Sequence, residues 1–214
     1  KNVKICASHA GLTLGEDGAT HQILEDIGMM KMLPGMTVIN PCDYNQTKLA
    51  TIALGDHVGP AYLRFGRPKW PIFTPENAKF KIGKGIKFLN GNDISIFATG
   101  HMLWQALEAE KILFSLGVSC EVINIHTIKP LDEKIILESI KKTKCAISCE
   151  EHNIIGGLGE SISRLISEKH PIPFKVIGVN DSFGESGKPL DLLEKYNLNP
   201  ESIKEAALEV IDKK

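Results

Sequence analysis

Along this chain, short runs of apolar residues alternate with stretches whose apolar positions recur every three or four residues, which indicates strands alternating with helices. In the first part we expect strands over 3–8, 37–41 and 61–65 and helices over 20–33 and 45–56. Ile23, Ile27 and Met30 would share one face of the first helix, which Pro34 and Gly35 end. This order is typical of a parallel sheet covered by helices.

The pattern changes between residues 66 and 92, where prolines and lysines are scattered and no long periodic stretch occurs. We interpret this as a connection between domains, with short strands within 80–89. Strands are then expected over 93–100, 119–128, 144–152 and 174–180, and helices over 102–117, 132–143, 157–169, 189–197 and 200–214. The sequence predicts an α/β protein of two three-layer domains with largely parallel sheets, over residues 1–91 and 92–214.

The chain begins at Lys1 and enters a strand-like run at once, so we expect it to be a piece of a longer chain whose first domain lacks its beginning. A net charge of -1 over 214 residues provides no basic field for nucleic acid or for anionic lipid. No apolar run approaches the length of a membrane span. We therefore expect neither nucleic acid nor a membrane as a partner.

Five cysteines, an odd number mostly within apolar runs, indicate reduced thiols in a cytoplasmic protein. Cys145, Cys149 and His152 are a conceivable metal set. However, the alternation in "KCAISCEEH" predicts a strand, and the spacing suits zinc poorly. We interpret these cysteines as buried thiols and expect no metal site in this chain.

The segment "GEDGATHQ" has a simple structural interpretation and a functional one. In the first, Asp17 and Gly18 form a turn, and Thr20 is the N-cap of the next helix. In the second, Gly15 and Gly18 form a tight backbone that another molecule can approach closely. Asp17 would then accept hydrogen bonds from a polyhydroxylated ligand. His21, in the first helical turn, would be a neutral imidazole because the helix dipole disfavours its charged form.

His9 follows the first expected strand, while Arg64 and Arg67 in "RFGRPKWP" follow the third. Strand ends of open α/β sheets are where ligands bind, and a guanidinium group binds phosphate through two parallel hydrogen bonds. The alternative is that each arginine pairs with a surface carboxylate.

The segments "SHAGLTLGEDGATHQ", "FGRP", "HTIKPLD", "CEEHNIIGGLGE" and "SGKP" resemble the transketolase family over essentially the whole chain. The resemblance implies the later part of a pyrimidine-binding domain followed by a complete C-terminal domain. It also implies transfer of a two-carbon ketol unit from a ketose phosphate to an aldose phosphate, a reaction of the pentose phosphate pathway. Thiamin diphosphate, with a divalent cation (Mg or Ca), would carry that unit.

The resemblance also implies roles for individual residues. His9 would hold the substrate phosphate beside Arg67, and Arg64 is placed with the substrate-binding residues. Asp17 would bind the hydroxyl next to the reacting carbon. His21 would face the aminopyrimidine of the cofactor and the oxygens of the transferred unit. Asp17 and His21 are thus the expected catalytic residues, and His21 is the one cofactor contact.

Parts of the family pattern do not occur in this chain. By the resemblance, the glutamate that activates the cofactor and the aromatic residues around its ring belong upstream of Lys1. A Gly-Asp-Gly segment with its Asn, expected for the diphosphate and its metal, is not found. Ala19 stands where many members have Pro, and Glu16 is interpreted as scaffold. We expect this chain to bind little or no cofactor, to be inactive alone, and to form a homodimer or pair with an N-terminal part.

Polar residues of the second domain are expected to make structural hydrogen bonds: His126, Glu150, Glu151 and His152. The glycine-rich turn over 156–159 is a conceivable anion site at a helix start, but we expect it to serve packing and dimer support.

Three other functions are alternatives. Deoxyxylulose-phosphate synthase shares the fold that the resemblance implies but lacks this "GEDGATHQ" pattern, and the beta subunit of a pyruvate-type dehydrogenase has no need of a phosphate-binding arginine. A dimerising or regulatory module without a catalytic site is the alternative outside the enzyme class, because an α/β fold alone does not imply catalysis.

Overall fold

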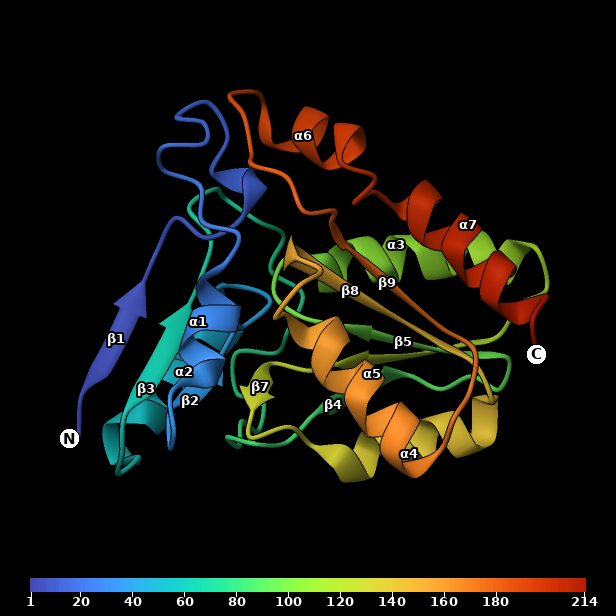
Figure 1. Cartoon of the computed structure of the whole chain (residues 1–214), viewed down its shortest axis with the longest axis horizontal. Coiled ribbons are helices and arrows are strands. Elements are labelled where there is room, and N and C mark those ends of the chain that lie inside the picture. The colour runs from blue at the N-terminus through green and yellow to red at the C-terminus, as the bar shows by residue number, and fades with distance from the viewer.

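A computed structural model describes all 214 residues, which form two sheets with flanking helices (Figure 1). The first sheet has the order β1-β3-β2-β7, formed by Lys4–Ala7, Ala61–Arg64, Thr37–Ile39 and Thr127–Lys129. The second has the order β4-β6-β5-β8-β9, formed by Ile86–Leu89, Cys120–Asn124, Ile94–Ala98, Ala146–Asn153 and Phe174–Val179. The predicted α/β class with two largely parallel sheets is confirmed.

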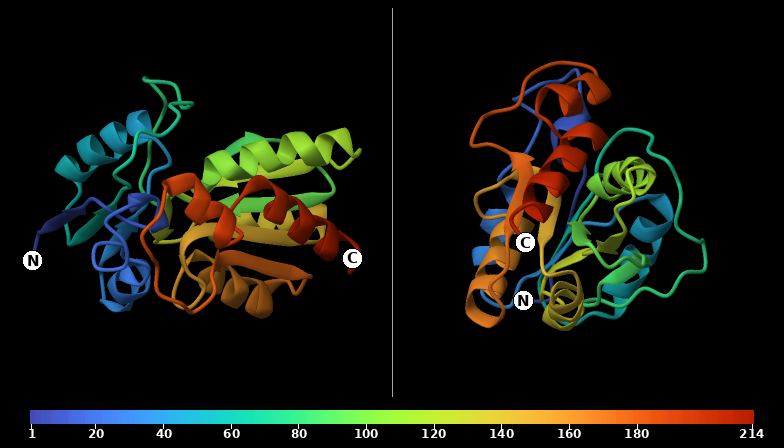
Figure 2. Two further views of the ribbon diagram at one scale, coloured as in Figure 1. Left: turned by 90° about the horizontal axis from the view of Figure 1, so that it is seen from above. Right: turned by 90° about the vertical axis from the view of Figure 1, so that its right-hand side faces the viewer.

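Seven α-helices and one short 3-10 helix surround the sheets. They are η1 Leu12–Leu14, α1 Asp26–Met32, α2 Tyr44–Asp56, α3 Met102–Ser115, α4 Glu133–Thr143, α5 Leu158–Lys169, α6 Pro189–Lys195 and α7 Pro200–Ile211. Helices α3 and α7 cover one face of the second sheet, and α4 and α5 cover the other (Figure 2). No helix is both long enough and apolar enough to cross a membrane.

Each sheet is parallel except for one strand at its edge. β7 pairs antiparallel with β2, and β4 pairs antiparallel with β6. β7 comes from the second half of the chain, yet it completes the first sheet. β4 lies before residue 92, yet it belongs to the second sheet. The two halves therefore exchange edge strands.

This exchange explains why the single strand expected over 119–128 is wrong. The chain leaves the second sheet after Asn124 and enters the first sheet at Thr127. Between them the N–H of Ile125 donates to the Ala98 carbonyl at 2.8 Å, and the His126 carbonyl accepts from the N–H of Asn40 at 2.8 Å. The apolar run is continuous because the chain stays buried while it crosses from one sheet to the other.

The helix expected over 20–33 begins only at Asp26. The reason is that upstream carbonyls are bonded elsewhere: that of Ile23 accepts from the N–H of Gly11 at 3.0 Å, and that of Leu24 accepts from the N–H of Asn153 at 2.8 Å. Tertiary hydrogen bonds therefore replace the helical ones. The N-cap prediction for Thr20 is also wrong, because its hydroxyl donates to the carbonyl of Asp17 within a turn.

A buried ion pair joins the two halves beneath this loop. The Nε of Arg64 donates to Asp26 Oδ2 at 2.8 Å, and its Nη2 donates to the carbonyl of Glu151 on β8 at 2.8 Å. The Tyr62 hydroxyl donates to the same Asp26 oxygen at 2.7 Å. Burial would raise the pKa of Asp26, but Arg64 and Tyr62 hold that pKa below its ordinary value. The guanidinium group of Arg64, a residue of the first sheet, thus also binds the backbone of the second sheet.

Replacing Arg64 by Met should lower the free energy of unfolding by about 3–5 kcal/mol, because the Asp26 carboxylate would stay buried without its cation. Arg164→Met is the control, since Arg164 is exposed on α5 and pairs with Glu168 at 3.4 Å. That change should cost about 0–1 kcal/mol. Urea unfolding measures both, and similar losses for the two variants would contradict the role given to Arg64.

Candidate active site at the edge of the first sheet

The residues at the centre of the predicted site meet. Arg67 Nη1 donates to Asp17 Oδ2 at 2.5 Å, although the two residues lie 50 positions apart. Their side chains are 46% and 42% exposed, so a ligand can reach both. Each also keeps hydrogen-bonding capacity that the pair does not use, since a guanidinium group has five donors and a carboxylate has two acceptor oxygens. The structure thus brings one cation and one anion together at an accessible place.

Arg67 is held in place by contacts with the second domain. A Cβ at Gly66 would lie 2.2 Å from the His101 ring, so only glycine allows the chain to pass so close. The Trp70 ring stacks on the same imidazole, with centroids 4.3 Å apart and an interplanar angle of 9°. His101 therefore fixes the segment that carries Arg67.

Arg67 also lines a cavity of about 650 Å³ between the start of α2 and residues 65–72. Tyr44, Trp70 and Ile72 contribute apolar and aromatic surface to this cavity, and His101 closes one side. The guanidinium group thus contacts Asp17 and borders an open space as well. A ligand at Arg67 therefore has room beside the ion pair.

His9 stands close to this edge. It follows β1, whose last residue pairs with Arg64, and the N–H of Ala10 donates to the carbonyl of Phe65 at 3.3 Å. His9 is exposed, with its Nδ1 2.7 Å from the Ser8 hydroxyl oxygen. Its φ of 70° lies in the left-handed region, which non-glycine residues adopt rarely and often at functional sites. Its Nε2 is left for a ligand.

His21 lies in the same loop as Asp17, but not where a helix dipole acts on it. Because α1 begins at Asp26, the prediction that His21 lies in the first turn of a helix is wrong. Its N–H donates to the carbonyl of Gly18 at 3.0 Å, and its Nδ1 is 2.9 Å from the Thr20 hydroxyl. The ring is exposed, so its Nε2 can face a ligand.

Arg64 does not join the other predicted residues. Its side chain is 3% exposed and is engaged with Asp26 and the carbonyl of Glu151, as described above. Arg64 lies within β3 and points inward, whereas Arg67 lies beyond the strand and is exposed. We therefore assign Arg64 to the buried ion pair and not to ligand binding.

The two glycines of the loop are approached closely, but by this chain itself. Gly15 and Gly18 have φ values of 89° and 73°, a conformation that favours glycine. A Cβ at Gly18 would lie 2.3 Å from the Ser186 hydroxyl oxygen, and one at Gly15 would lie 3.2 Å from the ring of Pro189. The expectation that they make room for another molecule is not met, because residues 186–189 occupy that space.

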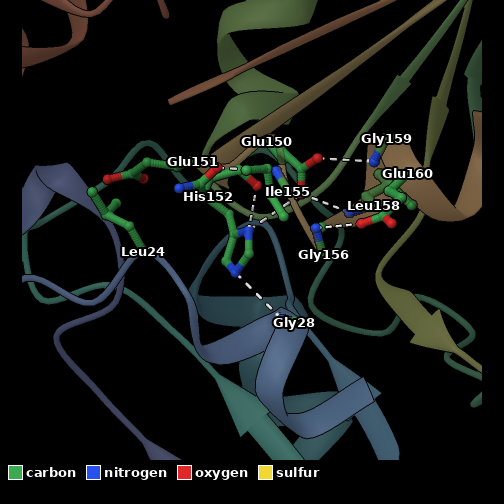
Figure 3. Close-up of polar contacts among 12 residues, drawn as sticks. Leu24, Gly28, Glu150, Glu151, His152, Ile155, Gly156, Leu158, Gly159 and Glu160 are labelled. Carbon is green, nitrogen blue, oxygen red and sulfur yellow. Dashed lines mark hydrogen bonds and ion pairs between the residues drawn. The ribbon is translucent and has the colours of Figure 1, made fainter. Parts of the chain in front are cut away.

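The acids on β8 make structural hydrogen bonds, as Figure 3 shows for Glu150. Its carboxylate accepts from the N–H of Leu158 at 2.6 Å and from that of Gly159 at 2.8 Å, at the start of α5. The chain's own carboxylate therefore fills the glycine-rich turn that was a conceivable anion site. Burial raises the pKa of Glu150 to about 7, although the two backbone donors act in the opposite direction.

Two histidines of the second half, His126 and His152, are buried, and the side chain of a third, His101, is 11% exposed. Burial lowers the pKa of His101 to about 3, and Arg64 lowers it further in the same direction. Burial also lowers the pKa of His126 to about 4 and that of His152 to about 4. His152 Nε2 accepts from the N–H of Gly28 on α1 at 3.4 Å (Figure 3). These rings are neutral and take part in packing between the two halves.

The chain offers little that would hold a cofactor. Across residues 1–214 no three His, Cys, Asp or Glu side chains come close enough to bind a metal ion. The cysteines are all free, and four of them are buried. The exposed polar residues at this site include the Asp17–Arg67 pair and, in the same loop as Asp17, His21. They do not fit a diphosphate with its metal.

Two residues secure the site: Glu151, for which structural hydrogen bonds were expected, and Gln22, for which the sequence predicted no role. The amide nitrogen of Gln22 lies within hydrogen-bond distance of three carbonyls around the loop, and Glu151 accepts from the N–H of Thr13 at 2.5 Å. Both act on partners distant in the sequence. Gln22 is the last residue of "GEDGATHQ", and this was the one indication of its importance in the sequence. Its hydrogen-bond partners could not be predicted from the sequence.

Comparison with known proteins agrees with this architecture. The family model of "Transketolase, pyrimidine binding domain" matches residues 1–71, and that of "Transketolase, C-terminal domain" matches residues 83–203. The chain thus combines two α/β domains of a transferase class. It belongs to the transketolase family.

Individual relatives cover nearly the whole chain. A putative transketolase C-terminal section of Methanocaldococcus jannaschii is 44% identical over 99% of this chain and 67% of that protein. A 6-deoxy-6-sulfo-D-fructose transketolase subunit of Clostridium sp. strain MSTE9 is 39% identical over 100% of this chain and 66% of that protein. A solved structure described as a split-gene transketolase, inactive beta4 tetramer, has a TM-score of 0.93 at 38% identity, covering 99% of this chain and 68% of that one. This chain therefore spans about two thirds of the length of these relatives.

The buried histidines predict how stability changes with pH. The pKa of His126 falls from 6.5 to about 4 on folding, so between these values the unfolded chain binds one more proton. Its contribution to stability is therefore lost as pH falls through that window. His126→Gln should reduce the pH slope of the unfolding free energy by about 1.4 kcal/mol per pH unit.

Urea unfolding at several values between pH 6.5 and pH 5 measures this slope. Glu150 acts with the opposite sign, because its pKa is raised on folding, so the difference between variant and parent isolates the histidine. Parallel slopes for the two proteins would show that folding does not lower the pKa of His126.

Proposed function

We propose that this chain supplies the sugar-binding part of a transketolase that moves a two-carbon ketol unit from a ketose phosphate to an aldose phosphate. Asp17 and His21 are the proposed catalytic residues, and His9 and Arg67 hold the terminal phosphate. The observation that carries this proposal is the meeting of Asp17 and Arg67 at one accessible edge of the first sheet. Membership of the transketolase family supports the class of reaction.

In the unliganded chain, Asp17 occupies a donor of Arg67 that a phosphate would use. When a sugar phosphate binds, the Asp17–Arg67 ion pair therefore opens. The phosphate accepts hydrogen bonds from the guanidinium group, and the sugar hydroxyls donate to the Asp17 carboxylate in its place. Bidentate binding of phosphate by arginine favours the exchange. Asp17 is then free to accept a hydrogen bond from the hydroxyl next to the reacting carbon, which orients the sugar.

His21 and His9 complete the site from either side. His21 has its Nδ1 beside the Thr20 hydroxyl, so its Nε2 is the atom that donates to, or takes a proton from, an oxygen of the transferred unit. His9, beyond the end of β1, brings its Nε2 toward the phosphate. Thiamin diphosphate, when bound, supplies the electron sink for breaking and forming the carbon–carbon bond.

The cofactor and its divalent cation would be held largely by another part of the enzyme. This chain has no cluster of metal ligands, and its relatives extend well beyond it. We propose that it pairs with an N-terminal transketolase part, within one chain or as a separate subunit, or with a second copy. We propose as well that it is inactive alone and acts in the cytoplasm. The description of the similar solved structure as inactive supports the inactivity of such a chain.

Within this proposal, residues 1–91 are the later part of the pyrimidine-binding domain with its linker, and residues 92–214 are the C-terminal domain. Sugars of the pentose phosphate pathway are the proposed substrates. The clostridial relative is named for a fructose that carries a sulfonate. This name supports a wider class of proposed substrates, namely sugars with a terminal oxyanion.

Mixing the chain with an N-terminal transketolase section and thiamin diphosphate should restore ketol transfer. Asp17→Ala and Arg67→Ala should each abolish most of the restored activity. The first removes the contact with the sugar hydroxyl, and the second removes the contact with the phosphate. Glu16→Ala is the control, since Glu16 is an exposed acid in the same turn. Restored activity that is indifferent to the first two changes would contradict the assignment of the site.

Arg67→Met should weaken the use of phosphorylated sugars much more than that of free hydroxyaldehydes. The loss of kcat/KM should correspond to about 1.5–3 kcal/mol for the phosphorylated acceptor, the range for a hydrogen bond to a charged group. Arg67→Lys should recover only part of it, because the planar fork is lost. Equal losses for both kinds of acceptor would count against phosphate binding at Arg67.

A further inference from the structure

The segment that carries Asp17 and His21 has little to hold it from its own domain. Its polar side chains at positions 16, 17, 20 and 21 are exposed, and it contains no helix beyond the single turn of η1. Its backbone hydrogen bonds are short-range, from Gly15 to Leu12 and from Gly18 to Gly15. Turns of this kind are mobile unless other parts of the protein fix them. We name residues 12–22 the 12–22 loop. The residues that pack around this loop therefore determine the position of the Asp17 side chain.

The second domain contacts the start of this loop through Glu151. The carboxylate, 3% exposed, accepts from the N–H of Thr13, whose hydroxyl lies 3.1 Å from His101 Nδ1. A Cβ at Gly11 would lie 2.3 Å from Glu151 Oε1, so the backbone at Gly11 packs directly against the Glu151 carboxylate. One end of the 12–22 loop is thus attached to β8.

The second domain also covers the middle of the loop, through residues 183–189. Ser186 lies against Gly18, and Pro189 lies against Gly15. This covering segment is itself anchored: the Tyr196 hydroxyl donates to the carbonyl of Phe183 at 2.9 Å and contacts Glu185 Oε1 at 3.2 Å. In Figure 1 the segment leading into α6 lies over the blue N-terminal loop.

Gln22 joins the loop to this covering segment. Its two N–H groups donate to the carbonyls of Leu12 at 3.1 Å and Glu185 at 3.0 Å, and the carbonyl of Gly15, 3.4 Å from Nε2, shares one of these hydrogens. The residue is buried, and a Cβ at Gly184 would lie 1.9 Å from its Oε1. One amide group therefore ties two points of the 12–22 loop to the far end of the chain.

We infer that the second domain serves the site by holding the 12–22 loop, and that Gln22 is the positioning residue on which this depends. Gln22 does not touch the ligand. It acts through the loop backbone, which sets the distance from Asp17 to Arg67. This assigns a role to the C-terminal domain, and its catalytic consequence rests on the proposed function.

Gln22→Glu tests this inference with little change of shape. The variant places carboxylate oxygens against carbonyl oxygens where the parent has N–H donors, so the contacts become repulsive. Gln46→Glu is the matched control: Gln46 is also buried, but its Oε1 is an acceptor, for the N–H of Cys42 and the amide of Asn124. That change removes no donor that is in use. Gln22→Met, which deletes the polar contacts without adding charge, is a second variant in case the first does not fold.

Amide hydrogen exchange in the chain itself is the first readout. Gln22→Glu and Gln22→Met should speed the exchange of the Gly18, His21 and Gln22 N–H groups by about tenfold or more, the factor that corresponds to losing one or two net hydrogen bonds. Exchange in α2 should not change, and Gln46→Glu should leave the loop as it is. Unchanged exchange in the 12–22 loop would overturn the inference, as would equal acceleration throughout the molecule.

Kinetics of the enzyme completed with its N-terminal part are the second readout. Gln22→Met should raise KM for the acceptor sugar phosphate by about tenfold and change kcat at saturating sugar much less, because a mobile loop must be ordered by the ligand. A fall in kcat with an unchanged KM would overturn the positioning role. Failure of the parent to transfer any ketol unit would contradict the proposed function instead, since the exchange result needs no catalysis.

Discussion

The guanidinium group of Arg64 is the point on which the arrangement of the two halves depends. It is buried, it neutralises Asp26 at the start of α1, and it donates to the backbone of β8 in the other sheet. If the guanidinium group moved away, the Asp26 carboxylate would be buried without its partner, at a large cost in free energy, so the ion pair holds the guanidinium group in place. Its bond to the carbonyl of Glu151 therefore fixes how the halves meet. Glu150 and His152 add further buried polar contacts to this interface, through the N–H groups of Leu158, Gly159 and Gly28.

That interface matters for function because the candidate site is built by both halves. The side chains proposed to bind a sugar, Asp17 and Arg67, come from loops of the first half. Their positions depend on His101, Glu151 and residues 183–189 of the second. Edge strands are exchanged in the same way, since β7 completes the first sheet and β4 the second. The C-terminal domain thus supports the site, and its His101 lines the cavity beside Arg67.

Local pattern was enough to predict the α/β class, most strands and helices, and the meeting of Asp17 with Arg67, because strand ends of one parallel sheet face the same edge. The pattern was not enough where distant residues decide the outcome. The carbonyls of Ile23 and Leu24 are bonded to other segments, so the helix starts late. Gly15 and Gly18 make room for the far end of the chain. Arg64 is turned inward by the strand that carries it.

The most direct test of the central claim is a crystal structure of this chain with an N-terminal transketolase section, thiamin diphosphate and a ketose phosphate. We predict that the Asp17–Arg67 pair opens, with the phosphate on Arg67 and a sugar hydroxyl on Asp17, while the 12–22 loop keeps its contacts with Glu151 and Ser186. A sugar phosphate bound elsewhere, with the ion pair intact and no ligand atom near Asp17, would contradict the account.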